Sequence, residues 1–368
     1  MTAHIVYAVP NWGHKPQRVL RRGKQLLQRV GVPVSAIGDR DIVHTENWPR
    51  KSPYENTRNL FDAFSRAMPS KLYDLSEKIH IEFDKSDVFV GHPSFPYSGK
   101  PSVTEFALSC SKVRPKFLSI ISPLHCNVSV QTGHINKPFL DSVDRIVDNA
   151  DVLFAIMGEY WWDIWESSPY ARWKKKMIRL DMGIDLAFFP RVKTHFNKPG
   201  KRGYLYIGRS DPMKGVGYLS ELLRRVGEFP KAWIGYGPDI PGVRRYSADA
   251  SLTPEFMRHV AEEFDFFITT GVADPNPTTI LEAMAWGFPV ICTPQSGYYK
   301  KEYLNNVFLD DIGGGVEVLR RLQYQRESEL MEMADRARAV VQEQYSWDRF
   351  TDGILASVRS HVAAGGDK

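Results

Sequence analysis

The chain contains 368 residues, of which 43% are hydrophobic and 25% are charged, and its formal net charge is +5. This composition is typical of a globular protein, and the length predicts two domains. No stretch approaches the roughly eighteen uncharged apolar residues of a membrane-spanning helix, and the N-terminus lacks the pattern of a secretory signal. The modest charge permits contact with phosphates or an anionic membrane but requires neither.

The cysteines give no sign of a metal site. Cys110, Cys126 and Cys292 are odd in number and have no metal-ligand spacing. This usage fits buried thiols in a reducing compartment, so we expect a cytoplasmic protein.

The first half of the chain predicts a parallel α/β sheet, because strand patterns alternate with helix patterns. The strands are expected at residues 4–9, 88–91, 116–121, 152–157 and 177–180, and the helices at residues 15–30, 54–68 and 138–149. Ligands of such sheets bind where the strands end, and Gly13, His92 and His125 follow three of these strands. The absence of a Gly-x-Gly-x-x-Gly fingerprint counts against an NAD or FAD enzyme.

A basic, polar segment with Pro199 and Gly200 divides the chain at residues 191–202, which we interpret as a linker. The second domain again alternates strands and helices. Its strands are expected at residues 203–207, 232–234, 266–269, 288–291 and 307–309, and its helices at residues 216–226, 254–263, 277–286, 316–325, 327–344 and 347–362.

The segment 274–294 predicts a loop, a short helix and a buried strand. Asn276 suits the helix N-cap, Pro277 suits the first helical position, and Gly287 suits the end of the helix. Asp274 precedes this helix and Glu282 lies two turns into it. A helix start favours an anionic ligand and carboxylates accept hydrogen bonds from sugar hydroxyls, so the pattern suits a sugar nucleotide. A capped helix with two solvated acids is the alternative.

The segment 208–215 is a second candidate half-site, because it follows a predicted strand and carries two cations. Gly208 would let the backbone approach a ligand, Arg209 can fork two phosphate oxygens, and Lys214 adds a point charge. Two solvated surface cations are the alternative for this segment taken alone.

These segments together resemble the retaining GT-B glycosyltransferases of glycosyltransferase family four. The similar stretches are the acid-x7-acid pattern before Ala-Met-Ala-x-Gly-x-Pro-Val, the Gly-Arg-x4-Lys-Gly segment, the turn Gly235-Tyr236-Gly237-Pro238 and residues 182–190. The family usually has Glu where this chain has Asp274. The resemblance covers the second domain and the end of the first.

The resemblance implies a GT-B fold, in which two Rossmann-like domains face each other across a cleft. We expect an acceptor-side domain at 1–190, the linker at 191–202, a nucleotide-sugar domain at 203–346, and a last helix, within 347–368, that packs back on the first domain.

The resemblance also implies roles for individual residues in donor binding. Glu282 would accept the ribose hydroxyls, and Asp274 would hold the transferred sugar. Arg209 and Lys214 would stabilise the charge on the leaving diphosphate, so that no metal or other cofactor is needed. The remaining donor-binding residues would be Gly13, Gly208, Gly235, Tyr236, Gly237, Asn276, Thr278 and Thr279.

The base of the reaction has three candidates. His125 lies where the family has a histidine near the donor sugar, and His92 is the alternative base. A histidine has a pKa suited to taking the acceptor proton. The leaving phosphate could take that proton instead.

A membrane contact is a further expectation. The helix at 15–30 has a basic face, and residues 159–176 combine four tryptophans with three consecutive lysines. Aromatic residues beside lysines favour lipid headgroups, although a buried aromatic core would give the same pattern. The Asp-x-Asp pattern at 39–41 arises easily by chance, and we do not interpret it as a metal site.

The sequence therefore predicts a retaining hexosyltransferase that uses a UDP- or GDP-sugar and a glycan or lipid-linked acceptor. An epimerase or a phosphorylase on the same fold is one alternative. A non-catalytic protein that binds glycan or nucleic acid is the other, but no stacking-aromatic motif supports nucleic acid as a partner.

Overall fold

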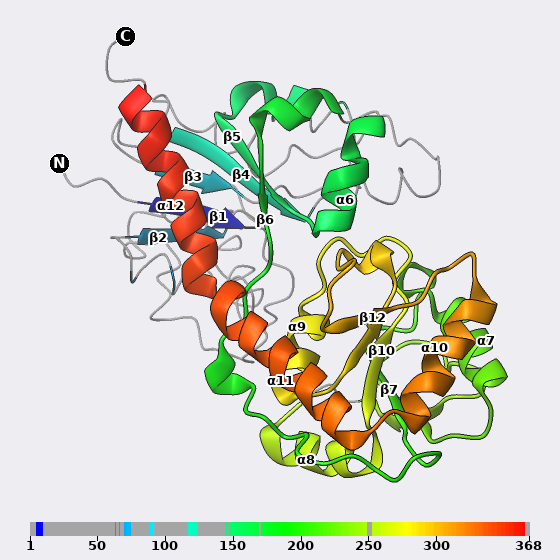
Figure 1. Ribbon diagram of the computed structural model, residues 1–368. Coiled ribbons are helices and arrows are strands. Elements are labelled where there is room, and N and C mark those ends of the chain that lie inside the picture. The colour runs from blue at the N-terminus through cyan, green and yellow to red at the C-terminus, as the bar shows by residue number, and fades with distance from the viewer. Residues whose placement is uncertain are drawn as a thin grey trace, which may run out of the picture. The chain divides into compact units, whose positions relative to one another are not determined.

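The computed structural model describes residues 5–9, 63, 66, 70–74, 88–91, 117–123, 141, 144–145, 147–168, 171–248 and 252–364. The chain divides into two units, whose elements are labelled in Figure 1. Unit 1 comprises Met1–Ser122, Asn136–Phe154 and Ile354–Lys368, and unit 2 comprises Pro123–Ile135 and Ala155–Gly353. The domain and linker boundaries expected from the sequence stay predictions.

Unit 1 is built on strands in the order β2-β1-β3-β4-β5, of which the pairs β1–β2, β1–β3 and β3–β4 are parallel. They are β1 (Ile5–Val9), β2 (Ser70–Asp74), β3 (Val88–Gly91), β4 (Phe117–Pro123) and β5 (Val152–Ile156). β5 is buried along its whole length, as its uninterrupted apolar sequence requires of a strand covered on both faces. The sequence did not predict β2, because its Ser-Lys-Leu-Tyr-Asp pattern is short and polar at both ends.

The last helix, α12 (Trp347–Ala364), ends in unit 1. The ring of His361 meets the edge of Phe117 with centroids 5.2 Å apart, and its Nε2 lies 3.5 Å from Asp151 Oδ1. These contacts join the helix to β4 and to the residue before β5, so the end of the chain returns to the first sheet as expected.

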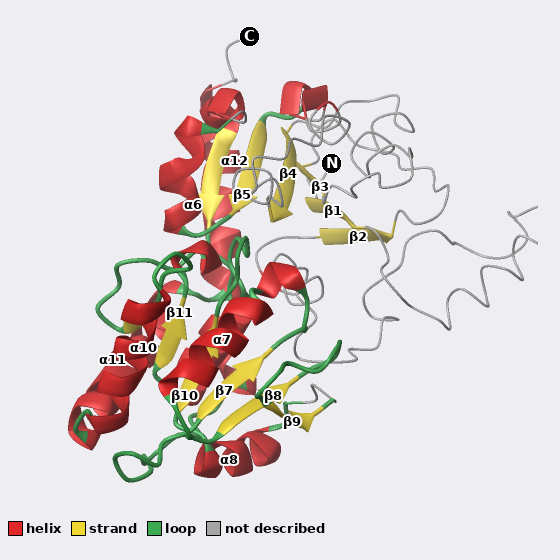
Figure 2. Ribbon diagram, turned by 90° about the vertical axis from the view of Figure 1, so that its right-hand side faces the viewer, coloured by secondary structure: helices red, strands yellow, loops and turns green. Residues whose placement is uncertain are grey.

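Unit 2 begins with the helix α6 (Glu159–Ile164), two short 3₁₀ turns and the strand β6 (Met177–Leu180), and then forms the second sheet. That sheet has the order β12-β11-β10-β7-β8-β9 and its pairs are parallel (Figure 2). Its strands are β7 (Tyr204–Ile207), β8 (Lys231–Ile234), β9 (Arg244–Ser247), β10 (Phe266–Thr269), β11 (Val290–Cys292) and β12 (Leu304–Asn306).

Helices cover both faces of the second sheet. They are α7 (Val216–Val226), α8 (Pro254–Glu263), α9 (Thr278–Trp286), α10 (Ile312–Tyr324) and α11 (Glu327–Gln344). In Figure 1, α7 and α10 lie on one side of β7 and β10, and α9 and α11 lie on the other. No helix in the described part of the chain is long and apolar enough to span a bilayer.

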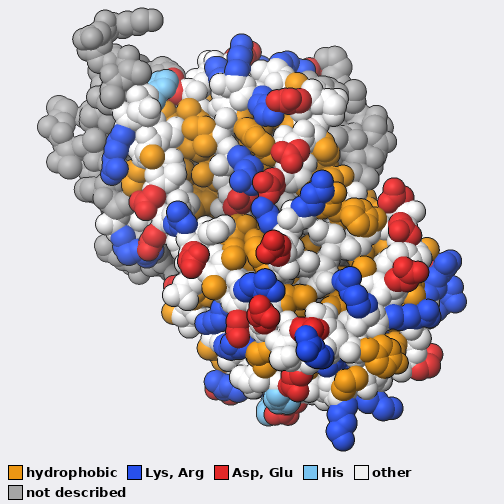
Figure 3. All heavy atoms as spheres, in the orientation of Figure 1, with side chains coloured by type: hydrophobic (Ala, Val, Ile, Leu, Met, Phe, Trp, Pro, Cys, Tyr) orange, Lys and Arg blue, Asp and Glu red, His pale blue; other side chains and the backbone are white. Residues whose placement is uncertain are grey.

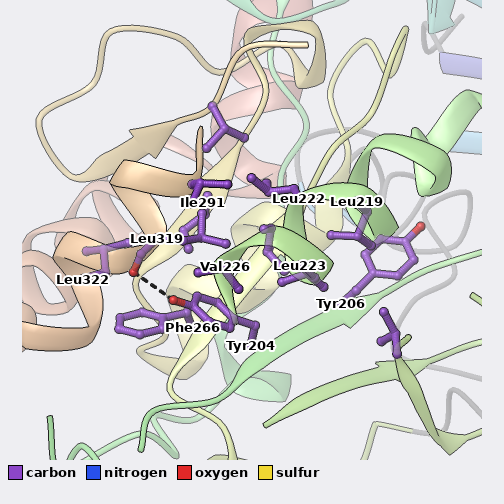
Figure 4. Packing of buried hydrophobic residues seen from close by; sticks show 14 of the residues in the cluster. Tyr204, Tyr206, Leu219, Leu222, Leu223, Val226, Phe266, Ile291, Leu319 and Leu322 are labelled. Atoms are coloured by element: carbon purple, nitrogen blue, oxygen red, sulfur yellow. Dashed lines mark hydrogen bonds between the residues drawn. The ribbon is translucent and has the colours of Figure 1, made fainter. Parts of the chain in front are cut away.

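The core between the second sheet and the helices α7 and α10 consists of side chains from the apolar strands and from one face of each helix. Figure 4 shows Tyr204 and Phe266 beneath Leu219, Leu222, Leu223 and Val226 of α7, with Leu319 of α10 beside them. Tyr204 is fully buried, and its hydroxyl donates to the main-chain oxygen of Leu319 at 2.8 Å. That bond satisfies the one polar atom that the ring brings into the core.

Two predicted elements of this unit need correction, and one strand was missed. The predicted helix at 316–325 begins earlier, at Ile312, because Asp311 caps it by accepting from the main-chain N–H of Gly314 at 2.8 Å. Its early glycines disfavour a helix in isolation, but a Cβ on Gly315 would lie 2.9 Å from the hydroxyl of Tyr218. The predicted strand at 307–309 is instead β12, and β9 was missed because Arg244 and Arg245 give this edge strand a charged sequence.

A buried ion pair fastens the segment between β6 and β7 to the second sheet. Lys193 and Asp265 have side chains that are 1% and 0% exposed, and Lys193 Nζ lies 2.8 Å from Asp265 Oδ1. Lys193 Nζ also donates to the main-chain oxygens of Ala261 and Phe264, at 2.7 and 2.9 Å. Asp265 accepts in addition from the main-chain N–H of Gly203, at 2.9 Å. The charges are thus both paired and hydrogen-bonded, which is what their burial demands.

Replacing Lys193 with methionine should destabilise the protein strongly, because the buried Asp265 carboxylate would lose its ion-pair partner. The expected loss is about 3–5 kcal/mol of unfolding free energy, measured by urea denaturation. Arg224→Met, which breaks a surface pair with Glu221, is the matched control and should change stability little. Equal midpoints for the two variants would contradict the assignment.

Candidate functional site

The strand order of the second sheet reverses between β7 and β10. β7 is first in the chain but lies in the middle, with β8 and β9 on one side and β10, β11 and β12 on the other. In open parallel sheets, ligands bind beyond the carboxyl ends of the strands at such a reversal, because the loops there diverge to opposite faces. The loops that follow β7 and β10 carry the two segments that the sequence singled out.

These two loops touch through Gly215 and Thr270. Gly215 has φ +67°, and a Cβ there would lie 1.8 Å from the main-chain oxygen of Thr270, so only glycine fits. Thr270 Oγ1 donates to the main-chain oxygen of Gly215 at 3.1 Å, and the N–H of Val272 donates to the oxygen of Met213 at 3.0 Å. The contact holds Lys214 beside the acid-bearing loop.

The turn after β8 packs against the start of the 208–215 segment. The N–H of Gly208 donates to the oxygen of Ile234, and that of Ser210 to the oxygen of Tyr236, each at 3.0 Å. A Cβ on Gly235 would lie 2.0 Å from the main-chain oxygen of Gly208. The glycines therefore permit close contact between the backbones of the two loops.

Arg209 and Tyr236 project away from this backbone framework. The side chain of Arg209 is 55% exposed, and its Nε lies 3.3 Å from Asp211 Oδ2. Tyr236 is 62% exposed, and Gly237 accepts from Arg245 Nη2 at 2.7 Å. Asp211 also caps the short 3₁₀ turn Pro212–Lys214, because its Oδ1 accepts from the N–H groups of Met213 and Lys214.

The two candidate half-sites meet in an ion pair between Lys214 and Asp274. Lys214 Nζ donates to Asp274 Oδ2, and the two side chains are 23% and 15% exposed. The main-chain N–H of Asp274 donates to the oxygen of Gln295 at 3.1 Å, which fixes the backbone behind the carboxylate. A cation and an anion thus share one partly solvated position at the strand reversal.

Asn276 is not the N-cap of α9, contrary to the sequence prediction. The helix begins at Thr278 with Pro277 as its N-cap, and no side chain of the described residues caps it. The Asn276 side chain instead makes three contacts with residues that are distant in the sequence or lie in another loop. Its Oδ1 accepts from the main-chain N–H of Met182 at 2.7 Å and from the hydroxyl of Tyr298 at 3.4 Å, and its Nδ2 donates to Asp181 Oδ1 at 3.1 Å.

Thr278 and Thr279 occupy the first positions of α9, where the helix presents unpaired N–H groups. Both are half-buried. The helix ends as predicted, with Gly287 in the left-handed region at φ 90°. The open start of the helix directs partial positive charge toward the loop that carries Asp274.

Glu282 is buried in α9, with 5% of the residue exposed. Burial raises the pKa of its carboxyl group from 4.5 to about 7, although a hydrogen bond with Thr278 opposes the change. The group therefore exchanges its proton close to neutral pH, which distinguishes it from the solvated acid that was the alternative reading of the sequence.

Three of the predicted site residues, Gly13, His92 and His125, lie outside the described residues. Their roles stay predictions, as does the basic helix expected at 15–30.

The tryptophans of the 159–176 segment are largely core residues. Trp161, Trp165 and Trp173 are at most 3% exposed. Lys174 lies over the ring of Trp162, 4.9 Å from its centroid, and pairs with Glu166 at 2.7 Å. The buried aromatic core proposed as the alternative to a membrane contact accounts for these three residues, and a membrane contact stays a prediction without them.

Two positioning residues escaped the sequence analysis. Thr270 joins the loops after β7 and β10, and the main-chain oxygen of Gln295 receives both the N–H of Asp274 and, at 3.0 Å, Nε1 of Trp161. Each residue follows the end of a strand of the second sheet. That position was the feature of the sequence from which their role could have been predicted.

The surface in Figure 3 carries basic and acidic side chains interspersed over the face shown. A nucleic acid backbone is typically met by a continuous basic patch or stripe. That face offers none.

No family model matches the sequence. A putative teichuronic acid biosynthesis glycosyltransferase, TuaC of Bacillus subtilis (strain 168), is 25% identical over 182 residues. The match covers 45% of this chain and 44% of that protein, so the chain is matched to less than half the length of this curated relative.

Solved structures match over the full chain. Sucrose-phosphate synthase from Thermosynechococcus elongatus superposes with a TM-score of 0.62 at 14% identity, over 99% of this chain and 100% of that one. An α,α-trehalose-phosphate synthase (UDP-forming) from Burkholderia vietnamiensis gives 0.59 at 13% identity, over 100% and 99%. The fold is the α/β GT-B fold, and the resemblance to GT-B glycosyltransferases drawn from the sequence is confirmed.

The raised pKa of Glu282 should make the protein less stable as the pH rises. Below about pH 4.5 the carboxyl is protonated in both the folded and the unfolded chain, so it has no effect there. Between pH 4.5 and 7 the unfolded chain loses the proton first, and on the order of 3 kcal/mol of stability is lost by pH 7.

Glu282→Gln should abolish that loss. Urea denaturation at pH 5 and pH 7.5 measures it, with Glu317→Gln, at an exposed position of α10, as the matched control. A pH dependence in Glu282→Gln equal to that of the unaltered protein would refute the raised pKa.

Proposed function

We propose that the chain is a retaining glycosyltransferase that moves a hexose from a nucleoside diphosphate sugar to a hydroxyl group of a glycan, a glycolipid or another glycoconjugate. The observation that carries this proposal is the Lys214–Asp274 pair at the strand reversal. In a sugar nucleotide the diphosphate and the hexose are adjacent. A site for it therefore needs a cation for the phosphates and an acceptor for sugar hydroxyls side by side, which is what this pair supplies.

The diphosphate is assigned to Arg209 and Lys214. Arg209 is exposed and held near Asp211, so it can turn toward an incoming anion without leaving the loop. Lys214 would exchange Asp274 for a phosphate oxygen. The two cations stabilise the charge that grows on the leaving diphosphate, and this electrostatic assistance needs no divalent metal. Gly208, Gly235 and Gly237 keep the adjoining backbone close enough to reach the ligand.

The hexose and the ribose are assigned to the two acids. Asp274, released from Lys214, accepts hydrogen bonds from a ring hydroxyl of the transferred sugar. Glu282, whose carboxyl carries a proton for part of the time near neutral pH, can both donate to and accept from the ribose hydroxyls. The main-chain N–H groups at the start of α9, near Asn276, Thr278 and Thr279, complete the contacts.

UDP is the preferred nucleotide in this proposal. The name of the similar trehalose-phosphate synthase describes it as UDP-forming. The name of TuaC connects that relative with teichuronic acid biosynthesis, which supports a glycoconjugate acceptor. His125, or the leaving phosphate, takes the proton from the acceptor hydroxyl.

A thermal-shift screen of UDP- and GDP-sugars tests the proposal directly. A donor present at 100 times its dissociation constant should stabilise the protein by about 2.7 kcal/mol. Arg209→Gln should weaken that stabilisation, whereas Arg326→Gln, on the distant start of α11, should not. Proton NMR of the product then reports whether the anomeric configuration of the donor is kept. The proposal fails if no sugar nucleotide shifts the melting temperature.

Asp274→Asn should separate the two roles of the ion pair. The change frees Lys214 from its competing anion, so UDP alone should bind several-fold more tightly. Transfer of the hexose should fall by at least tenfold, because a neutral amide is a weaker acceptor for the sugar hydroxyl.

Isothermal titration with UDP and a radiolabelled-sugar transfer assay give the two quantities. Asp310→Asn, at an exposed position, is the matched control for charge. Weaker binding of UDP to Asp274→Asn would show that Asp274 supports rather than competes with the phosphate contact.

A further inference from the structure

A polar cavity of about 390 Å³ lies in unit 2 outside the loops assigned to the donor. The side chains in its lining that matter here are Glu159, Arg179, Asp181, Lys301, Tyr345 and Arg349. They come from the start of α6, the end of β6 and the residue after it, the loop after β11, and the segment from the residue after α11 to the first turn of α12. Ligand pockets are usually lined mostly by apolar groups, so this lining points to a polar, charged occupant.

Main-chain contacts hold the walls of the cavity in place. The N–H of Gly158 donates to the oxygen of Pro275 at 2.7 Å, and the N–H of Ile184 donates to the oxygen of Tyr345 at 3.0 Å. A Cβ on Gly158 would lie 2.0 Å from the main-chain oxygen of Gly297. Segments far apart in the sequence are therefore packed backbone to backbone, and the cavity between them is a preformed feature of the unit.

The lining of the cavity carries more cationic than anionic side chains. Lys301 pairs with Glu159, and Arg179 Nη1 lies 3.1 Å from Asp181 Oδ2. Arg349 donates to the main-chain oxygen of Glu343, and no carboxylate among the described residues pairs with it. Three cationic side chains thus face two carboxylates, and the guanidinium of Arg349 has donors left for an anion.

The Asp181 carboxyl group already has partners in the wall of the cavity. Burial raises the pKa of its carboxyl group, against the opposing effect of Arg179. Its Oδ1 already accepts from Asn276 Nδ2 at 3.1 Å. An incoming anion therefore meets a carboxyl group whose charged form is disfavoured by burial.

We propose that this cavity binds a small phosphate ester, whose phosphate is held by Arg349 together with Arg179 and Lys301 and whose hydroxyls are held by Glu159. A dianionic phosphate matches a forked guanidinium and a second cation, which a monovalent anion would leave partly unpaired. The volume lies toward the lower end of the range for small-molecule sites, which suits one phosphorylated sugar or polyol rather than a nucleotide. The site is separate from the assigned donor contacts, although Asn276 borders both.

Calorimetric titration of the full chain, at constant ionic strength, tests the site with three probes: inorganic phosphate, glucose 6-phosphate and glucose. Glucose 6-phosphate should bind, and glucose should not. Binding of inorganic phosphate with the same affinity as the ester would show that the site takes free phosphate alone and would overturn the part of the proposal that concerns the ester.

Two substitutions with opposite expected effects on binding make the test more specific. Arg349→Gln should weaken glucose 6-phosphate roughly tenfold or more through the loss of a charged hydrogen bond. Glu159→Gln should strengthen the binding of inorganic phosphate several-fold, because Lys301 would lose its competing partner. It should also reduce the preference for the ester over phosphate, because a neutral amide accepts less strongly from the hydroxyls of the ester. A merely structural role of these side chains would not produce that gain. Arg326→Gln, which removes a surface arginine paired with Glu329, is the matched control and should bind as the unaltered protein does.

Three results would overturn the site. The first is the absence of any binding heat with glucose 6-phosphate, and the second is unchanged affinity in Arg349→Gln. The third is loss of binding in Arg209→Gln, because the phosphate would then occupy the donor loops. Retention of binding in Arg209→Gln, together with loss in Arg349→Gln, assigns the ester to the cavity whether or not the proposed transfer reaction is correct.

Discussion

The reversal of strand order between β7 and β10 is the constraint on which the candidate site depends. It sends the loop after β7 and the loop after β10 in opposite directions and opens a place for a ligand between their first residues. The loop after β7 can approach the loop after β10 and the turn after β8 only because Gly215 and Gly235 leave room for neighbouring backbone. Topology thus selects the location, and glycine at two positions allows the polar side chains to gather at it.

Charges at and around the site are already engaged before any ligand arrives. Lys214 forms an ion pair with Asp274, Arg209 with Asp211, and Lys301 with Glu159. Such pairs keep partly buried cations solvated by protein atoms, so that the loops are ordered in advance. An incoming phosphate must replace the carboxylate that is paired with each cation. The net binding free energy is therefore the difference between the cation–phosphate and the cation–carboxylate interaction. Selectivity for a dianion over a carboxylate follows, because only the stronger anion displaces the partner.

Much of the second sheet could be predicted from the sequence, because the pattern that defines each strand or helix lies within the residues of that element. The apolar strand at 266–269, the amphipathic α7 and the glycine after α9 each follow from the residues that they contain. Asn276 shows where that reasoning stops. By local rules it caps a helix, yet it bonds to Asp181 and Met182, which lie far away in the sequence. The cavity beside it could not be predicted either, since its lining comes from four separate segments.

The donor half of the site was partly predictable for the same reason. The spacing of Arg209 and Lys214, and of Asp274 and Glu282, is a property of single segments. Their pairing is not, because the contact between Lys214 and Asp274 depends on how β7 and β10 neighbour each other. The protonation of Glu282 near neutral pH depends on burial, which the helical pattern alone left open between a solvated and an enclosed acid.

The buried pair of Lys193 and Asp265 also bears on the rates of folding and unfolding. Both charges must lose their water before they can meet, and they come from segments that are distant in the chain. Contacts of that kind are absent from a transition state that has formed only its local helices and nearest strand pairs. The pair then contributes little to the speed of folding and raises the barrier to unfolding. Its main effect is to prolong the lifetime of the folded second sheet, within which the candidate site persists.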